Sequence, residues 1–190
     1  MMTTIRRLGL AVLVAAAGSA AHAGDTYTVD PVHSSVIFKI SHVGISYIYG
    51  RFDDFGGQFT IDTDDPTKSS FELSVKVESV DTNNKQRDEH LRAPDYFNAK
   101  QFPTMTFTSK SVKPVTGGYE VSGDLTLHGV SKPVTFTLKG GDKVVEFPKG
   151  MHRVGFTTEL TIKRSDFDMK TSLDALGDEI PIEIGVEAAK

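Results

Sequence analysis

Strict alternation of apolar and polar side chains restricts the fold of this chain more than any other feature. Between Phe71 and Glu78 every second residue is apolar, and each residue between them is polar or charged. A side-chain period of two is that of a β-strand, and one apolar face per strand is typical of an antiparallel sheet with its other face in water. The same pattern recurs along the chain, in residues 35–43, 59–61, 104–108, 121–127, 134–138, 154–162 and 180–186.

About eight such strands joined by short turns predict one all-β domain, either a closed barrel or a two-sheet sandwich. Asn84–Leu91 breaks the alternation, because it is rich in Lys, Gln, Arg, Asp and Glu and lacks β-branched residues. We predict a short helix there, ending before Pro94, with Asp95 able to cap one further turn. Pro181 falls within the last strand and therefore indicates a strand start, an edge or a bulge.

Residues 1–23 have the pattern of a cleaved signal peptide. Arg6 and Arg7 precede an apolar run that ends at Gly18, and Ala21–Ala23 is a small-x-small cleavage site. The apolar run is too short to cross a hydrocarbon core of about 30 Å. We therefore predict cleavage before Gly24, a periplasmic location, and a mature single domain of residues 24–190 without a membrane span.

The charge balance and the missing motifs argue against several functions. The chain has a net charge of −4, and losing the two arginines of the leader makes it more acidic, which argues against nucleic-acid binding. Without cysteine it has no disulfide, thiolate nucleophile or Cys-ligated zinc. It contains no GxSxG, P-loop, GxGxxG or HExxH motif, and its histidines are widely spaced. We assign no catalytic residue and no metal site.

The most polar stretch, Ser79–Leu91, has two interpretations. In one, Arg87 and His90 bind an anionic head group at the mouth of a pocket, because a planar guanidinium offers phosphate paired donors. In the other, Asp81 caps the turn into the helix and Arg87 pairs with a neighbouring carboxylate, which is the more common use of such residues. The glycine-rich aromatic segment Gly44–Phe59 could likewise line a pocket, form a lid or pack within a loop.

Several motifs follow one another along nearly the whole mature chain. They are Tyr27-x-Val29-Asp30-x-x-His33-Ser34, Phe38-x-Ile40-x-His42-x-Gly44, Gly50-x-Phe52-x-x-Phe55-x-Gly57-x-Phe59, Ser79-Val80-Asp81-Thr82, Arg87-Asp88-x-His90-Leu91, Asp95-Tyr96-Phe97, Phe102-Pro103, Phe107-x-Ser109 and Gly123–Val134. In this order they resemble the YceI-like family of periplasmic, lipocalin-like, polyisoprenoid-binding proteins. The chain departs from the usual family residues at Tyr96, Ser131 and Asp168.

This resemblance implies an extended eight-stranded antiparallel barrel, with a short helical segment near its mouth and a hydrophobic tunnel inside. It also implies a carrier for a long isoprenoid-type lipid, such as a polyprenyl chain or the tail of an isoprenoid quinone. No catalytic residue carries over, and no cofactor is expected beyond the bound lipid. An apolar tunnel would suffice for binding, because each buried methylene contributes about 0.8 kcal/mol.

The predicted site has two parts. The tunnel wall consists of inward-facing strand residues, namely Phe38, Ile40, Phe59, Leu73, Val75, Phe107, Leu125, Phe136 and Phe156. The mouth, where the polar end of the lipid would lie, consists of His42, Tyr49, Arg87 and His90. An exposed strand edge near Pro181 could also support a homodimer.

Two other hypotheses stay open. An enzyme acting on an apolar molecule would use a histidine as general base and would need a titratable group buried beside its ligand. A structural or stress-protective periplasmic protein would instead have a barrel filled by its own side chains. A long continuous cavity would count against this last hypothesis.

Overall fold

The computed structural model describes residues 24–190, so the predicted signal peptide lies outside the described residues. The chain forms mainly β-strands, as the alternation predicts, together with the short helix α1 (Lys85–Arg92). The strands are β1 (Asp25–His42), β2 (Ser46–Phe52), β3 (Phe55–Ile61), β4 (Ser70–Lys76), β5 (Val80–Asp81), β6 (Thr104–Val115), β7 (Gly118–Leu127), β8 (Val130–Glu146), β9 (His152–Lys163) and β10 (Glu179–Ala189).

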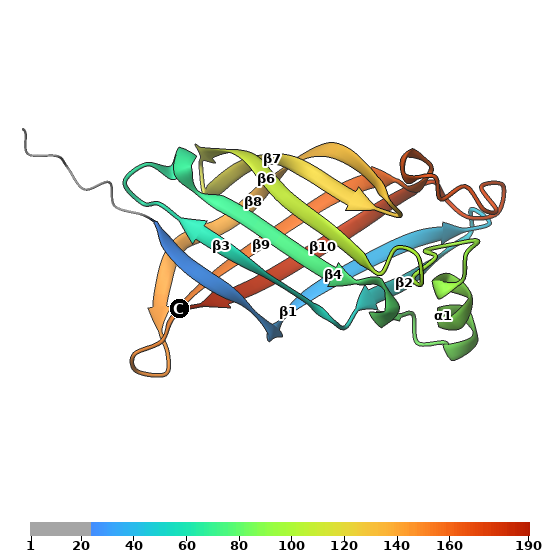
Figure 1. Cartoon of the computed structure of the whole chain (residues 1–190), viewed down its shortest axis with the longest axis horizontal. Helices are drawn as coiled ribbons and strands as arrows, with labels where there is room; N and C mark the ends of the chain where they lie inside the picture. The colour runs from blue at the N-terminus through green and yellow to red at the C-terminus, as the bar shows by residue number, and fades with distance from the viewer. Residues whose placement is uncertain (1–23) are drawn as a thin grey trace, which may run out of the picture.

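The sheet closes on itself. Its order is β10-β9-β8-β7-β6-β4-β3-β1, every pairing is antiparallel, and β10 also pairs with β1. These eight strands form an elongated barrel, and β2 and β5 add a short extension beside the second half of β1 (Figure 1). The eight-stranded antiparallel barrel is therefore confirmed, and the sandwich is excluded.

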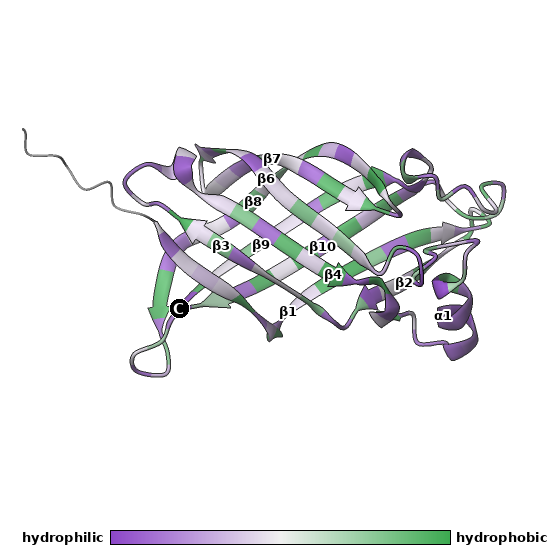
Figure 2. Ribbon diagram, viewed as in Figure 1, coloured by the Kyte–Doolittle hydropathy of each residue, from purple (hydrophilic) through white to green (hydrophobic). Residues whose placement is uncertain are grey.

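The two ends of the barrel differ. One end carries α1, the β1–β2 and β7–β8 turns and the long β9–β10 connection, as Figure 1 shows. Toward the other end, the rings of Phe59, Phe71, Tyr119 and Phe156 pack together with centroid separations of 5.3–6.1 Å. Green and purple segments alternate along the strands in Figure 2, and the apolar members of this alternation face the interior. Side chains thus fill one end of the barrel, and the helix lies at the other.

Helix α1 lies one residue further along the chain than predicted, and its cap is different. The Asn84 side chain accepts a hydrogen bond from the Arg87 backbone N–H at 3.1 Å, so Asn84 is the cap. The predicted cap, Asp81, instead accepts from the Asn83 backbone N–H at 2.7 Å and forms the preceding turn. Asp81 was therefore the wrong choice, because the chain makes one additional turn before the helix begins.

The predicted ion pair of Arg87 with a carboxylate is also wrong. Arg87 donates from Nε to Thr82 Oγ1 and from Nη2 to the Thr82 carbonyl, both at 2.7 Å. Asp88 accepts from the Thr82 backbone N–H and hydroxyl at 2.9 and 2.5 Å. Thr82 therefore lies between the two charged side chains. Asp95, in the segment that follows α1, lies with its Oδ2 2.6 Å from His90 Nε2.

Pro181 lies near the start of β10, opposite Thr161 of β9. Pairing of β10 with β1 begins one residue later, where Ile182 faces Phe38, so proline occupies a position outside the β1 ladder. The homodimer stays a prediction. Among residues 24–190, none of the helices has the length and apolar character that a membrane crossing needs.

Strand β1 is held to the barrel by a polar cluster at its central bulge. The register with β10 shifts between Asp30 and Ser35, and the Ser34 hydroxyl bonds to the Asp30 carbonyl at 2.6 Å. Asp30 Oδ2 lies 2.9 Å from both His33 Nδ1 and Arg153 Nη1, and Arg153 also binds Glu187. Bonds of this kind stabilise the charged carboxylate. The hydrogen bond with His33, followed by that with Arg153, lowers the pKa of Asp30 to about 2.

This low pKa predicts how the Asp30→Asn variant responds to pH. Above the ordinary Asp pKa of 3.8, wild type keeps the full stabilisation from the carboxylate, and it loses this stabilisation as the pH falls toward about 2. We expect the variant to unfold at lower denaturant concentration than wild type at neutral pH, with the difference shrinking below pH 3.8. Urea titrations monitored by circular dichroism measure this, with exposed Asp174→Asn as control. A difference that persisted unchanged at the lowest pH would show that the carboxylate charge is not responsible.

Candidate functional site

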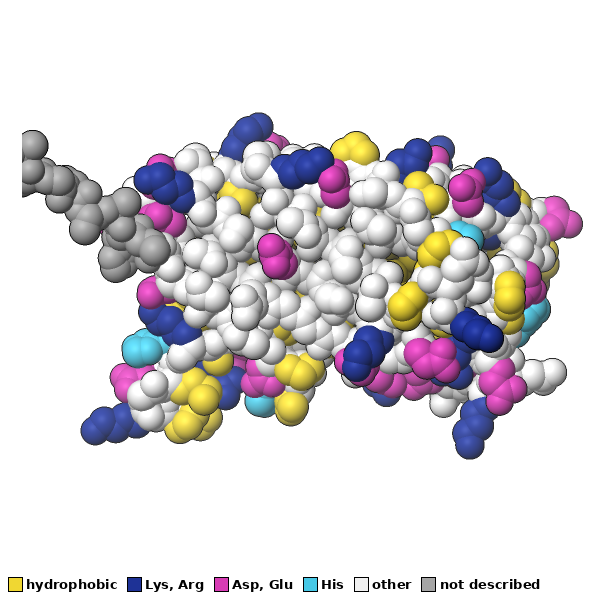
Figure 3. Space-filling view, in the orientation of Figure 1, with side chains coloured by type: hydrophobic (Ala, Val, Ile, Leu, Met, Phe, Trp, Pro, Cys, Tyr) yellow, Lys and Arg dark blue, Asp and Glu magenta, His cyan; other side chains and the backbone are white. Residues whose placement is uncertain are grey.

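The interior of the barrel is not filled. A cavity of about 670 Å³ extends between the helix end and the aromatic cluster, within the range typical of small-molecule sites. Its wall is mostly aliphatic and aromatic, with polar residues largely from α1 and the neighbouring loops. Figure 3 shows the contrast with the outside, where charged and other polar groups cover most of the face in view.

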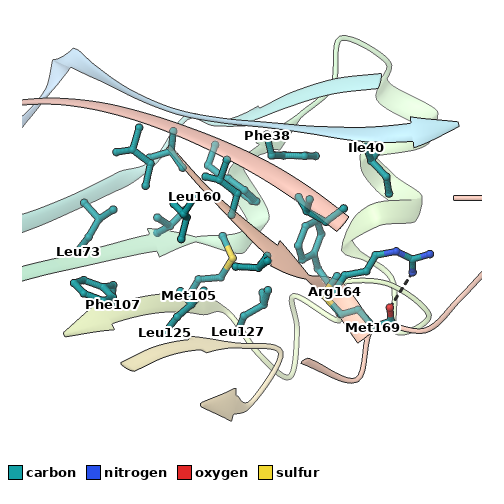
Figure 4. A pocket seen from close by; sticks show the side chains of 18 of the residues that line it. Phe38, Ile40, Leu73, Met105, Phe107, Leu125, Leu127, Leu160, Arg164 and Met169 are labelled. Carbon is teal, nitrogen blue, oxygen red and sulfur yellow. Dashed lines mark hydrogen bonds between the residues drawn. The ribbon is translucent and has the colours of Figure 1, made fainter. Parts of the chain in front are cut away.

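The wall follows from the strand period. Alternate residues of β1 line the cavity, namely Val36, Phe38, Ile40 and His42, and on β10 the sequence Ile180, Ile182, Ile184 and Val186 does the same. Figure 4 shows Leu73, Met105, Phe107, Leu125 and Leu127 facing the same space from other strands. Since successive side chains in a strand point to opposite faces, the alternation in the sequence specifies this wall.

Most of the predicted tunnel residues lie around the cavity. The structure brings together Phe38, Ile40, Phe59, Leu73, Val75, Phe107, Leu125 and Phe136. Phe156 is not among the lining residues and is only 2% exposed. Its ring packs edge-on against Phe59 and Phe71 at 5.7 and 5.5 Å. It faces inward as predicted but lies within the filled end of the barrel, so it supports the floor of the cavity.

Three of the four predicted mouth residues line the cavity: His42, Arg87 and His90. Tyr49 does not, and its side chain is 61% exposed. It lies on β2 between Ile48, which lines the cavity, and buried Gly50, so the strand period turns its ring outward. Tyr49 is therefore placed on the outer surface of the hairpin.

Sequence reasoning missed Arg164, which lines the cavity and is the first residue after β9. It is 5% exposed and donates four hydrogen bonds to backbone carbonyls of the β9–β10 connection, those of Met169, Thr171, Leu176 and Gly177, at 2.8–3.0 Å. Figure 4 shows the bond to Met169. Burial lowers the pKa of Arg164 below its ordinary value. The guanidinium still remains charged, because its ordinary pKa is so high. No pattern in the sequence indicated that these loop carbonyls would surround it.

Hydrogen bonds tie the mouth segments together. The Val43 backbone N–H donates to the Ala175 carbonyl at 2.7 Å, and the Gly177 N–H donates to the Ser41 carbonyl at 2.9 Å. The Thr171 hydroxyl donates to the Asp95 carbonyl at 2.5 Å. The β9–β10 connection therefore joins the β1–β2 hairpin to the segment after α1, and places Arg164 at the same opening as the helix.

One group of three side chains among the described residues has the proximity of metal ligands, namely Asp30, His33 and Glu187. The guanidinium of Arg153 already binds both carboxylates of this group. This cluster lies at the β1 bulge and none of its members lines the cavity. It is therefore explained by ion pairing that holds β1 to β9 and β10.

A glycine makes room for one aromatic ring of the wall. Gly50 lies opposite Phe38 in the β1–β2 ladder, and a Cβ placed on Gly50 would lie 2.3 Å from Phe38 Cζ. The ring therefore lies over the glycine, and any larger residue would force it away from the wall. A Cβ placed on Gly123 would likewise lie 2.7 Å from Phe107 Cζ, although Gly123 lies opposite Ser109 in the β6–β7 ladder.

The Gly50→Ala variant should therefore have a smaller cavity. We expect several-fold weaker binding of an apolar dye such as N-phenyl-1-naphthylamine, and a loss of about 1 kcal/mol or more in unfolding free energy from overpacking. Fluorescence titration measures the first and urea denaturation the second. The matched control is Gly56→Ala, because a Cβ at Gly56 meets no atom within 4 Å. Equal dye affinity in both variants would show that Phe38 does not limit the cavity.

Comparison with known proteins agrees with this architecture. Residues 27–188 match the model of the YceI-like domain family. Protein YceI of Escherichia coli O17:K52:H18 is 40% identical over 193 aligned residues, covering 100% of this chain and 99% of that protein. Among solved structures, Burkholderia cenocepacia BcnA superposes with a TM-score of 0.76 at 26% identity, over 84% of this chain and 99% of BcnA. A domain of Saccharophagus degradans described as polyisoprenoid-binding has a TM-score of 0.63 at 21% identity, over 85% of this chain and 97% of that domain. The chain belongs to the YceI-like family.

Proposed function

We propose that this protein is a periplasmic carrier that encloses a long isoprenoid-type lipid in its barrel and catalyses no reaction. The observation that carries the proposal is the cavity of about 670 Å³ with its mainly apolar wall. Burying a methylene contributes about 0.8 kcal/mol, so a few isoprene units offset the cost of ordering a chain. The polyisoprenoid-binding description of the Saccharophagus degradans domain supports the lipid class. The cargo in this proposal is a polyprenyl chain or an isoprenoid-quinone tail.

The cavity also argues against the filled-barrel hypothesis. Aromatic rings fill the barrel around Phe59, Phe71 and Phe156, and side chains line a cavity beyond them. An empty apolar space forfeits packing contacts and destabilises a protein. A bound lipid would make those packing contacts. The lipid-carrier hypothesis therefore explains this interior better than the filled-barrel hypothesis does.

The cargo is tested by extraction. We expect mature protein purified from periplasm without detergent to contain a stoichiometric isoprenoid or quinone, identified by mass spectrometry of an organic extract. The reason is that an apolar chain in a dry cavity has little tendency to return to water. Protein that is empty and also fails to take up added long-chain lipids would contradict carriage.

The location is tested on the same preparation. Residues 1–23 have the pattern of a signal peptide, so the periplasmic fraction should contain a chain whose intact mass corresponds to residues 24–190. Arg6→Glu together with Arg7→Glu should trap the precursor, because the basic region before the apolar run is lost. Recovery of the full-length chain in the cytoplasmic fraction would contradict export.

The wall is tested with a buried charge. Leu73→Glu places a carboxylate in the apolar lining, and Ser74→Glu places the same charge on the exposed face of the same strand. We expect the first to abolish retention of geranylgeraniol, because leaving a carboxylate in an apolar cavity beside lipid costs several kcal/mol. The second should bind like wild type. Circular dichroism verifies folding, and normal retention by folded Leu73→Glu protein would show that Leu73 does not contact the lipid.

A further inference from the structure

The outer surface of the β1–β2 hairpin is apolar and aromatic. The exposed side chains of this surface, together with one from the adjacent β9–β10 connection, form what we call the hairpin patch: Val43, Ile45, Tyr47, Tyr49 and Leu173. Ile45 is 85% exposed. The bond from the Val43 N–H to the Ala175 carbonyl, at 2.7 Å, holds the connection beside the hairpin turn. Exposed apolar groups gathered in this way mark a contact with a protein or a membrane.

The chemistry of the hairpin changes with distance from its tip. Ile45 lies in the turn, Tyr47 and then Tyr49 follow on the outward face of β2, and the cations lie further back. Lys39 faces Tyr49 across the ladder, with its Nζ 5.2 Å from the centroid of the Tyr47 ring. Arg51 comes two residues after Tyr49 and pairs with carboxylates. Aliphatic, then aromatic with a hydroxyl, then cationic is the order met on leaving a bilayer, where tyrosine occupies the interface and lysine extends to water.

The turn itself contains a strained apolar residue. Val43 and Gly44 have φ angles of 44° and 72°, and the Ile45 N–H donates to the His42 carbonyl at 3.1 Å, as in a type I′ turn. Asn, Asp and Gly suit the central positions of this turn, whereas a β-branched residue with positive φ is an outlier. The Val43 side chain is exposed, so packing within the barrel does not explain its presence. An apolar contact outside the protein does.

The same hairpin forms part of the cavity wall. Ile40 and His42 of β1 and Ile48 of β2 line the cavity, and the residues between them face outward. Figure 4 shows Ile40 facing this space, and Figure 1 shows the hairpin turn at the end of the barrel that carries the helix. One face of the hairpin therefore lies against the cavity and the other against whatever contacts the patch. A bilayer at the patch would lie beside the opening.

The charges near the tip favour an apolar anchor over an electrostatic one. Asp174 follows Leu173 and is exposed, and Lys170 of the same connection pairs with Asp168 at 2.9 Å. Lys39 adds one positive charge on the hairpin side. A surface without an excess of basic residues gains little from anionic lipids. Insertion of apolar side chains does not require them.

We propose that the hairpin patch inserts into the surface of a phospholipid bilayer and holds the opening of the barrel against the membrane. This inference rests on the proposed carrier function, since it gives the cargo a route from bilayer to cavity without crossing water. Val43, Ile45 and Leu173 enter the acyl boundary, and the two tyrosines lie among the head groups. The strained turn persists because its valine contributes to this contact.

The first test measures co-sedimentation of mature protein, stripped of lipid, with phosphatidylcholine vesicles. We expect wild type to bind, with little change on adding salt, and Ile45→Ser to bind at least about tenfold more weakly, because the loss of one buried aliphatic side chain has this effect. Val32→Ser is the matched control, since Val32 is 82% exposed but lies at the β1 bulge. Its binding should equal that of wild type. Equal binding by Ile45→Ser and wild type would overturn the proposal.

A second variant separates the membrane contact from a structural role of the turn. Val43→Asn places a residue suited to positive φ at the strained position, so it should unfold at a higher urea concentration than wild type. The same variant should bind the vesicles about fivefold more weakly, because an apolar side chain is lost from the patch. A variant that is more stable and binds vesicles as wild type does would show that Val43 is not part of a membrane contact.

The other exposed apolar group, at the tip of the β8–β9 hairpin, provides the competing outcome. Phe147→Ser removes its most exposed ring and should leave vesicle binding unchanged. Loss of binding in this variant alone would place the membrane contact at the wrong end of the barrel and overturn the proposal. Wild type that ignores vesicles but dimerises in analytical ultracentrifugation, with Ile45→Ser monomeric, would assign the patch to a second copy of the chain instead.

The outcomes for docking and carriage are independent. Uptake of geranylgeraniol from vesicle-free solution measures carriage alone, and co-sedimentation with vesicles that contain no isoprenoid measures docking alone. Wild type that takes up geranylgeraniol but does not bind vesicles would overturn docking and leave carriage intact. Wild type that binds vesicles but takes up no geranylgeraniol would overturn carriage and leave the membrane contact established.

Discussion

The ladder between β1 and β10 closes the sheet, and the rest of the structure depends on this closure. A closed sheet has one inner surface, so every apolar face produced by the alternation meets the others around a common axis. The long strand β1 bulges between Asp30 and Ser35, and on both sides of the bulge its inward-facing residues lie opposite inward-facing residues of β10. The Asp30–Arg153–Glu187 cluster holds the bulge to the adjacent strand β10 and to β9, the next strand in the sheet. A surface ion-pair network thus stabilises the strand that completes the cavity.

Closure alone does not decide whether the interior is solid or hollow; side-chain volume along the axis does. Toward one end, Phe59, Phe71, Tyr119 and Phe156 fill the cross-section. Toward the other, Leu, Ile and Val residues line the cavity wall, and Phe38 lies over Gly50. Aromatic residues therefore have two roles in this barrel. Where several rings face one another, they close the barrel interior. Where a ring lies over a glycine, as Phe38 does, it forms part of the cavity wall.

The difference between the filled end and the hollow end of the barrel explains how far the sequence could predict the site. Period-two alternation identifies inner residues reliably, and the eight predicted residues around the cavity are all on inner faces. Alternation contains no information on position along the barrel axis, so Phe156 looked like a wall residue. Tyr49 faces outward because its neighbour Ile48 lines the cavity, and the sequence alone did not show which of these two residues faces inward. Arg164 owes its position to four loop carbonyls. Such contacts arise only once the strands are closed.

The polar residues at the mouth make the two ends of the cavity chemically different. A chain lying along the apolar wall gains the same free energy in either orientation, because the hydrophobic effect is non-directional. Direction requires a polar contrast, and the mouth provides it through Arg87 and Arg164, whereas toward the floor the lining formed by residues 24–190 is apolar apart from the buried hydroxyl of Thr158. A charged head group would be left without solvation at that floor. In the proposed carrier, entry with the tail first is therefore the orientation that places the polar end of the lipid at the opening.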